Sequence, residues 1–324
     1  MRVIVAPDSF KGTFSAEEVA AAMAVGVQRA GADVVQVPLA DGGEGTVDAL
    51  VGSSVVDMRV VEAIAPDGRT VEATYALDGA TAYVETAAAS GLHLIDPDTI
   101  DAYAATSAGT GQVLVAARDA GATQILLGVG GSGFSDGGAG ALAAIDAAGG
   151  LAGVRLKILC DVAVPYEECA EVFAPQKGAD PSTVQRLTTR LQWMAGELPR
   201  DPRGKARTGA AGGLAGALWS RWDAELVSGI DEILTRLRFA DLLTDADLVI
   251  TGEGRLDDQT QHGKVIDGVT RWAASAGVPV HAVVGQNRST DVVHRLGLAS
   301  LAEAGDEAAM AQACRQILRN RTRS

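Results

Sequence analysis

The stretch that decides the fold is VIVAPDSFKGTFSAEEVAAAM, residues 3–23. The apolar run at its start predicts a buried strand over residues 2–6. Ser15 is followed three residues later by Glu18, which is the pattern of a capping box and predicts a helix that continues to about Ala30. A strand followed by a short loop and a capped helix is the opening unit of an α/β domain.

The loop between this strand and this helix carries Asp8, Ser9 and Lys11. Lysine is rare in the chain, because only five of the 27 basic residues are lysines. Four of the five adjoin a glycine: Lys11, Lys177, Lys205 and Lys264. Chance placement among 39 glycines is the ordinary explanation. The functional explanation is anion binding, since glycine lets backbone N–H groups approach a phosphate and lysine adds a positive charge.

The outer parts of the chain repeat the strand and helix alternation of its start. Five strands are expected there, at about 2–6, 34–38, 247–251, 279–284 and 298–302. Five strands with helices between them favour a flavodoxin-like parallel sheet of order 2-1-3-4-5. The predicted fold class is therefore α/β, with a flavodoxin-like domain formed by residues 1–45 plus 226–324 and a mixed α/β domain, residues 46–225, inserted into it.

The inserted part begins with three strand-like runs that no helix separates, at 54–64, 70–78 and 81–90. The first two flank a Pro-Asp-Gly turn, so a meander is expected. From about residue 106 the alternation of helices and strands returns. Amphipathic helices are expected at 182–198 and 229–246.

The sheet topology predicts where a ligand binds. In a flavodoxin-like sheet the ligand crevice lies at the carboxyl ends of the strands, where the strand order reverses. The loop after the first strand carries Lys11, and the loop after the third carries Glu253, Arg255, Asp257 and Lys264. We therefore expect these two loops to meet at one crevice, although about 250 residues separate them.

Glycine-rich loops offer further sites for anions. Gly128, Gly130 and Gly133 match G-x-G-x-x-G, but no acidic residue is cleanly placed at the spacing of a dinucleotide site. Phosphate or carboxylate binding by backbone N–H groups at a helix N-terminus is the favoured interpretation. The residues expected to take part are Thr110, Gly111, Gly131, Ser132 and Lys177.

Acidic residues follow the predicted strands: Asp8, Asp41, Asp136, Asp161, Glu253 and Asp257. Any one of them could serve as a cap or a turn residue. Together with the basic residues they predict a magnesium–phosphate site, because Mg²⁺ takes one or two carboxylates plus phosphate oxygens. Asp8, Asp161 and Asp257 are the candidate metal ligands. A carboxylate near the attacking hydroxyl would complete a site for phosphoryl transfer.

Composition excludes several classes of function. A net charge of -14 disfavours nucleic acid and anionic membranes, and an aromatic content of 4% provides few stacking platforms. No run is long and apolar enough to span a bilayer, and the apolar run among the first residues is too short for a signal peptide. Three cysteines without a Cys-x-x-Cys pair indicate reduced thiols. A cytoplasmic protein that is a monomer or a homodimer is expected.

The motifs together resemble the class I (bacterial and plant-type) glycerate kinase family. The matching stretches run in family order along the chain: 3–16, 37–50, 85–95, 106–114, 129–140, 173–179, 209–218 and 248–264. The resemblance implies ATP- and Mg²⁺-dependent phosphorylation of D-glycerate, giving 2-phosphoglycerate or, in some members, 3-phosphoglycerate. It places Lys11 in the SFKG loop, Asp41 and Glu44 in ADGGEG, and Glu253, Arg255 and Asp257 in TGEGRLD.

The predicted activity is in-line phosphoryl transfer in a cleft between the two domains, with 2-phosphoglycerate favoured as the product. Lys11, Asp41, Asp136, Arg255 and Asp257 are the candidate catalytic residues. The candidate ligands of substrate and ATP are Asp8, Ser9, Glu44, Thr110, Gly111, Gly131, Ser132, Lys177, Glu253 and Lys264. Differences from the family pattern within 132–170 leave a kinase for a related small hydroxy acid as an alternative. An NAD-linked hydroxy-acid dehydrogenase and a non-catalytic anion-binding protein are the other two.

Overall fold

The structure is a computed structural model that describes residues 1–52, 55–256, 265–288 and 291–321. The chain divides into two compact units. The first unit comprises Met1–Asp41, Asp48–Gly52 and Ile230–Ser324, and the second comprises Gly42–Val47 and Ser53–Gly229. The second unit thus lies within the sequence of the first. The domain ranges 1–45 plus 226–324 and 46–225 stay a prediction.

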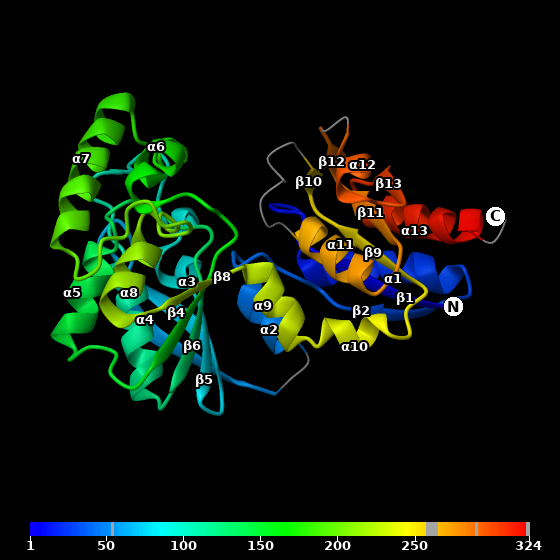
Figure 1. The fold of residues 1–324 in the computed structure, drawn as a ribbon, viewed down its shortest axis with the longest axis horizontal. Helices are drawn as coiled ribbons and strands as arrows, with labels where there is room; N and C mark the ends of the chain where they lie inside the picture. The colour runs from blue at the N-terminus through cyan, green and yellow to red at the C-terminus, as the bar shows by residue number, and fades with distance from the viewer. Residues whose placement is uncertain (53–54, 257–264, 289–290, 322–324) are drawn as a thin grey trace. The chain divides into compact units, whose positions relative to one another are not determined.

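The first unit is built on a parallel sheet, which has five strands in the described part of the chain. The strands are β1 (Arg2–Pro7), β2 (Asp33–Gln36), β9 (Leu248–Gly252), β11 (Val280–Val284) and β13 (Ser300–Glu303). Their spatial order is β13-β11-β9-β1-β2, and every neighbouring pair is parallel (Figure 1). Numbered within this unit, the order is 2-1-3-4-5. The predicted flavodoxin-like sheet and α/β class are therefore confirmed.

Helices cover both faces of this sheet, as in other doubly wound α/β folds. They are α1 (Ala16–Arg29), α2 (Thr46–Val51), α9 (Gly229–Arg236), α10 (Phe239–Leu243), α11 (Val265–Ser275), α12 (Val292–Leu296) and α13 (Glu307–Arg321). A two-residue pair, β10 (Arg255–Leu256) with β12 (Gln286–Asn287), completes the described elements of this unit.

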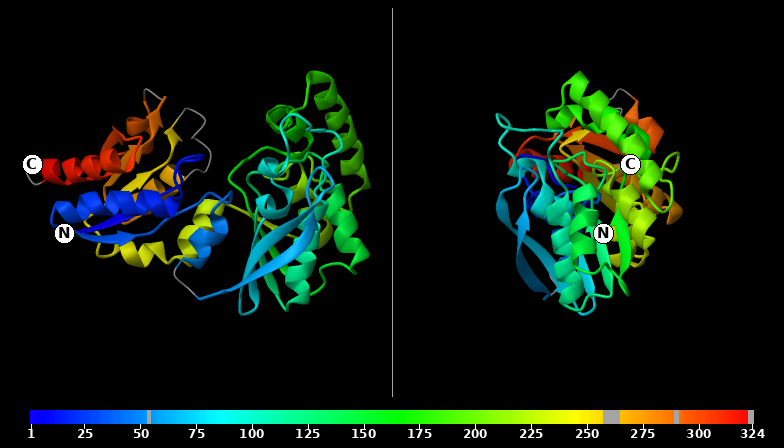
Figure 2. Two further views of the ribbon diagram at one scale, coloured as in Figure 1. Left: turned by 180° about the vertical axis from the view of Figure 1, so that it is seen from behind. Right: turned by 90° about the vertical axis from the view of Figure 1, so that its left-hand side faces the viewer.

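Alternation along β1 divides the core of the first unit into two layers. Ile4 belongs to an apolar cluster with residues of α9 and α11, whereas Val3 belongs to one with residues of α1 and α13. The helices α1 and α13 lie side by side in both ribbon views (Figure 2). They approach closely because Gly26 has no side chain; a Cβ there would lie 2.0 Å from the carbonyl oxygen of Ala311.

The predicted capping box is present at the start of α1. The backbone N–H of Glu18 donates to the Ser15 hydroxyl over 3.1 Å, and the backbone N–H of Ser15 donates to the Glu18 carboxylate over 2.8 Å. The cap fixes Ser15 as the residue at which the loop that carries Lys11 ends and α1 begins.

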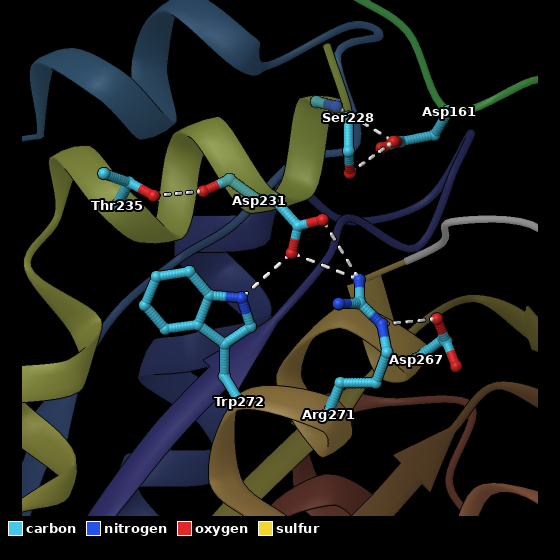
Figure 3. Close-up of polar contacts among 8 residues, drawn as sticks. Asp161, Ser228, Asp231, Thr235, Asp267, Arg271 and Trp272 are labelled. Atoms are coloured by element: carbon cyan, nitrogen blue, oxygen red, sulfur yellow. Dashed lines mark hydrogen bonds and ion pairs between the residues drawn. The ribbon is translucent and has the colours of Figure 1, made fainter. Parts of the chain in front are cut away.

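Polar contacts hold α9 against α11 in the first unit (Figure 3). Arg271 donates to Asp231 over 3.1 Å and to Asp267 over 3.1 Å, so its guanidinium lies between two carboxylates. The indole N–H of Trp272 also donates to Asp231, over 2.9 Å. Beneath these contacts Gly268 allows Ile230 to pack closely, because a Cβ at this glycine would lie 2.5 Å from the Ile230 side chain.

The second unit is built on a mixed sheet, with six strands among its described residues. They follow one another across the sheet in chain order: β3 (Asp57–Ile64), β4 (Thr70–Asp78), β5 (Thr81–Glu85), β6 (Gln124–Gly128), β7 (Arg155–Leu159) and β8 (Glu225–Val227). The first three form the predicted antiparallel meander, and β5 to β8 are parallel. The carboxyl ends of β5 to β8 therefore share one edge of the sheet.

The helical elements of the second unit are α3 (Thr86–Ser90), η1 (Leu92–Leu94), α4 (Ala108–Asp119), α5 (Ala139–Ala147), η2 (Tyr166–Glu168), α6 (Cys169–Phe173), η3 (Pro175–Lys177), α7 (Pro181–Glu197) and α8 (Leu214–Trp222). Asp180 caps α7 by accepting from the Thr183 amide over 2.7 Å. This helix lies one residue from its predicted position at 182–198.

The prediction of one helix over residues 229–246 is wrong. The segment forms two helices, α9 and α10, and Arg238 stands between them in the left-handed conformation, with φ of 53°. Leu237 packs against the same core cluster as Phe239. The break lets both apolar side chains reach that core, which one straight helix would not do.

Candidate active site

Three neighbouring strands of the first unit's sheet, β1, β2 and β9, are each followed by a segment that carries an acidic residue at the carboxyl edge. The amide of Asp8, directly after β1, donates to the carbonyl of Gly252 at the end of β9 over 2.8 Å. The chain after β2 stays beside β1, because the Leu39 amide donates to the Pro7 carbonyl over 2.9 Å. Asp8, Asp41 and Glu253 therefore follow three neighbouring strands, at the point where the strand order reverses.

Asp8 is the acidic residue whose environment is most unusual at this edge. It is 6% exposed, and it accepts hydrogen bonds from the Ser9 amide over 2.7 Å and the Ser9 hydroxyl over 3.3 Å. The pKa of its carboxyl is raised to about 7, mainly by burial and next by the negative charge of Asp41, whereas Lys11 and the hydrogen bonds from Ser9 oppose the shift. Asp8 and Asp41 thus form a pair of interacting carboxylates, which is suited to binding a cation.

The loops that carry Lys11 and Arg255 are in contact. A Cβ built on Gly254 would lie 3.2 Å from the Lys11 backbone nitrogen and 3.0 Å from the Phe10 Cα. Both cationic side chains are exposed, whereas Glu253 is buried. The two segments separated by about 250 residues therefore meet, as the sheet topology predicts. Asp257 and Lys264, the other predicted site residues of the second loop, lie outside the described residues.

In the second unit, a glycine-rich loop at 130–138, which contains the predicted ligand residues Gly131 and Ser132, follows β6. Its glycines allow close packing within the unit: a Cβ on Gly130 would lie 2.4 Å from Gly43, and one on Gly133 would lie 2.9 Å from Gly91. The Gly130 amide donates to the Gly42 carbonyl over 3.0 Å, and the Gly133 amide donates to the Ser90 carbonyl over 2.8 Å. Because these two amides donate to carbonyls of the protein, they are not available to a dinucleotide phosphate, which argues against a site of the G-x-G-x-x-G type.

Asp136 is buried within this loop and joins the starts of two helices. Its carboxylate accepts from the Ser107 amide and hydroxyl, each over 2.8 Å, at the beginning of α4. It also accepts from the Gly138 amide over 2.9 Å and the Gly140 amide over 3.0 Å, at the beginning of α5. Four hydrogen bonds occupy both oxygens, so the geometry favours a positioning role for Asp136 over proton transfer.

Other predicted ligand residues of the second unit are also engaged by protein groups. The amide and hydroxyl of Thr110 donate to the Ser90 hydroxyl over 3.1 and 2.9 Å. Ser132 accepts from the buried Lys177 amine over 2.9 Å. Gly111 lies where α4 crosses α5, and a Cβ there would meet Ala141 at 2.6 Å. The exposed Gly131 and Glu44 are the members of this set that face solvent.

Gly137→Ala tests how tightly the loop is packed. Gly137 has φ of 69°, and a Cβ there would lie 2.4 Å from the Tyr166 hydroxyl and 2.9 Å from Leu191. We expect the substitution to lower the free energy of unfolding by about 3 kcal/mol or more, from left-handed strain plus overpacking. Gly149→Ala is the matched control, because Gly149 has φ of 87° but open space around its Cβ position. Urea denaturation compares the two. Equal losses in both variants would contradict the packing.

Asp161, a predicted metal ligand, belongs to the second unit, whereas Asp8 belongs to the first. Its carboxylate accepts from the Ser228 hydroxyl and from the Gly229 amide, each over 2.9 Å (Figure 3). Within the described ranges of the chain, no three His, Cys, Asp or Glu side chains gather as a metal-ion site. The pair that best fits a magnesium ion completed by phosphate oxygens is Asp8 with Asp41.

Sequence reasoning did not single out Ser90, Ser107, Tyr166 or Arg190, although each of them holds a glycine loop in place. Ser90 and Ser107 lie inside motifs that were recognised, so proximity to those motifs was the available signal. Tyr166 and Arg190 carry no local signal, because their contacts with the loop span 29 and 55 residues of sequence.

Two grooves on the surface are lined by other residues. One groove of about 930 Å³ is lined by the edge strand β13 and by α13, and another of about 560 Å³ by residues near the start of α7. Neither contains a predicted site residue. Among the described helices, none is long and apolar enough to cross a membrane.

Comparison with known proteins decides the family. The sequence model of the glycerate kinase family matches residues 3–149 and 146–322, which is nearly the whole chain. The chain belongs to the glycerate kinase family. The predicted family and the predicted enzyme class are thereby confirmed.

Relatives in this family cover most of the chain. The sequence is 39% identical to the glycerate kinase of Bacillus subtilis (strain 168), over 93% of this chain and 89% of that protein. It is 37% identical to the glycerate 2-kinase of Escherichia coli (strain K12), over 92% of this chain and 89% of that protein. A crystal structure described as glycerate kinase 2 from Salmonella typhimurium LT2 aligns with a TM-score of 0.85 at 35% identity, covering 100% of this chain and 98% of that one.

Proposed function

We propose that the protein transfers the γ-phosphoryl group of ATP to D-glycerate, with 2-phosphoglycerate as the product. Membership of the glycerate kinase family over nearly the whole chain is the observation that carries this proposal. The similarity to the glycerate 2-kinase of Escherichia coli favours phosphorylation at the C2 oxygen. We expect a cytoplasmic enzyme that acts as a monomer or a homodimer.

The carboxyl edge of the first unit supplies groups suited to phosphoryl transfer. Lys11 and Arg255 present positive charge on two adjoining loops, where they would neutralise the transferred phosphate or the substrate carboxylate. The carboxylates of Asp8 and Asp41 would hold Mg²⁺, which supplies charge neutralisation of the phosphate oxygens when it is bound. An acceptor hydroxyl held in line with the phosphoryl group then reacts, because positioning and charge supply most of the catalysis in such transfers.

A related small hydroxy acid is the alternative substrate. Its support is the set of differences from the family pattern within residues 132–170. This segment includes part of the loop 130–138 and the region around η2, which are in contact in the second unit. A change there would alter the shape of the acceptor site more readily than the chemistry of transfer.

A substrate panel tests the proposal. The purified protein is mixed with ATP, Mg²⁺ and one of D-glycerate, L-glycerate, glycolate, lactate or hydroxymalonate, and ADP release is measured. We expect D-glycerate to give the highest kcat/KM and no turnover above background without Mg²⁺. Phosphorus NMR identifies the product, because a phosphate on C2 couples to one proton and a phosphate on C3 couples to two. No ADP above background with D-glycerate would overturn the substrate, and a phosphate on C3 would overturn the product.

A further inference from the structure

Three residues of the loop 130–138 are held by their carbonyl oxygens. Each carbonyl accepts a hydrogen bond from a long polar side chain of the segment 166–190, which follows β7 in the chain. The bonds are Lys177 Nζ to Phe134 O (2.6 Å), Arg190 guanidinium to Ser135 O (2.8 Å) and Tyr166 Oη to Gly137 O (3.0 Å). We call Tyr166, Lys177 and Arg190 the carbonyl clamp.

A small apolar cluster includes Tyr166 of the carbonyl clamp. Residues of η2, α6 and α7 form this cluster in the second unit: Tyr166, Cys169, Ala170, Ala174, Leu187, Leu191 and Ala195. Arg190 is fixed further by Tyr103, since it donates to the Tyr103 carbonyl over 2.9 Å and its guanidinium lies 4.5 Å from the ring centroid. Packing therefore positions the Tyr166 side chain, and the contacts with Tyr103 position that of Arg190.

Burying the charged amine of Lys177 costs free energy, because the amine loses its hydration. Its side chain is 5% exposed, and its amine contacts the Ser132 hydroxyl, the Phe134 carbonyl and the face of the Phe134 ring at 5.6 Å. Burial lowers the pKa of this amine to about 8, against the opposing effects of Cys169 and Asp136. An apolar side chain would fill the same space without this desolvation cost, so the two hydrogen bonds to the loop are what the amine provides.

The loop that the carbonyl clamp holds lies where ligands bind in α/β sheets. It follows β6 directly, at the carboxyl edge shared by the parallel strands β5 to β8. Gly131 at its start is exposed, whereas Lys177 is buried beneath it. The burial of its amine against Ser132 and Phe134 favours a positioning role for Lys177, through the loop, over direct contact with a phosphate.

We propose that the carbonyl clamp of Tyr166, Lys177 and Arg190 fixes the loop 130–138 in the conformation that receives the acceptor or the nucleotide, and that releasing any one donor mispositions this loop. The proposal rests on the proposed function for its kinetic readout, whereas its structural readout is independent of activity.

Hydrogen exchange gives the structural readout. Backbone amide exchange of the full-length protein is measured by mass spectrometry for Lys177→Met and Tyr166→Phe. We expect faster exchange in peptides that cover 130–138 and unchanged exchange in peptides from the first unit. Tyr75→Phe is the matched control, because Tyr75 is a tyrosine of the same unit that donates its hydroxyl to the carbonyl of Ala116, on α4, over 3.3 Å instead of to a carbonyl of the loop.

Kinetics separate positioning from a merely structural role. We expect Lys177→Met to lower kcat by about 10-fold or more and Tyr166→Phe by several-fold, with smaller changes in KM, since loss of alignment affects the transition state most. Rates are taken well below the unfolding midpoint and divided by the folded fraction, so a loss of stability alone leaves kcat unchanged. Tyr75→Phe and Lys157→Met, in which a partly exposed ion pair with Glu225 is lost, should keep the wild-type kcat.

The outcomes are distinct. Faster loop exchange together with reduced kcat supports the carbonyl clamp. Loop exchange equal to wild type in either folded variant, or a kcat within two-fold of wild type in either, overturns it. If Lys177→Met does not fold, Tyr166→Phe decides the matter by the same two measurements. A wild-type protein inactive on D-glycerate defeats the proposed function, and loop exchange still decides whether the carbonyl clamp holds the loop.

Discussion

Lys11→Met is expected to lower kcat/KM for phosphorylation of D-glycerate by about 10²–10³-fold, the range found when one group that stabilises transition-state charge is removed. Lys11 is exposed at the carboxyl edge of the first unit's sheet, on the loop that adjoins Gly254. Because it lies outside the apolar core, its loss should leave the thermal unfolding midpoint within a few degrees of wild type. Steady-state ADP release and thermal unfolding measure the two effects.

The control for Lys11→Met is Lys157→Met, which removes the same charge from β7 in the second unit. Because the net charge of the two variants is equal, any difference between them reflects position. Lys11→Arg is a further probe, since an ammonium and a guanidinium bind phosphate with different geometry. Full activity of Lys11→Met, or equal losses in the two methionine variants, would remove Lys11 from the proposed chemistry.

The first unit could be predicted from the sequence because its signals are local. Each strand is a short apolar run, and the capping box at Ser15 marks the start of α1. Parallel strands with intervening helices admit few topologies, since crossovers are right-handed and ligand loops gather at one edge. The meeting of the loops after β1 and β9 follows from the strand order and needs no knowledge of the side chains between them.

The helix break at Arg238 shows where local signals fail. Nothing in the sequence from Ile230 to Ala246 is a glycine or a proline, so propensity predicts a continuous helix. The break is imposed by the core, which takes Leu237 and Phe239 on the two sides of a left-handed residue. Tertiary packing has overridden propensity at this point.

Burial is the other property that a sequence does not display. Lys11 and Lys177 both adjoin a glycine, and the sequence predicts anion binding for both. One is exposed at a sheet edge, and the other is enclosed by Ser132 and Phe134. Asp136 likewise shares its pattern with Asp8, but four protein donors occupy it. Residue type and spacing show which loops carry charged residues, whereas long-range packing decides what each side chain contacts.

The charged form of the buried Asp8 carboxyl destabilises the fold, and the proposed function explains why an acidic residue stands there. Its pKa is raised from 3.8 to about 7, first by burial and then by the charge of Asp41. The folded state therefore binds a proton between these two values that the unfolded state has lost. The stabilising contribution of this group is complete below about pH 4 and disappears as the pH rises through about 7. Above that pH, in the absence of Mg²⁺, the fold carries a buried charge beside a like charge.

Asp8→Asn is accordingly expected to stabilise the metal-free protein at pH 8 and to abolish most of its activity. The asparagine keeps an acceptor for the Ser9 amide but carries no charge. A shift of about three pKa units corresponds to an upper bound of roughly 4 kcal/mol, so we expect an increase of about 2 kcal/mol or more in the free energy of unfolding at pH 8. The increase should shrink to near zero at pH 4, where the wild-type carboxyl is protonated in the fold.

The loss of activity at Asp8 has a separate cause from the gain in stability. A neutral amide binds Mg²⁺ poorly, so kcat/KM with ATP should fall by about 10²-fold or more, by analogy with other groups that stabilise transition-state charge. Asp33→Asn is the control, because Asp33 is an exposed acid on β2 of the same unit. Urea denaturation from pH 4 to pH 8 and ADP release test the pair of effects. A destabilised Asp8→Asn at pH 8 would show that this carboxylate does not carry the buried charge, and wild-type turnover would show that it does not serve the metal.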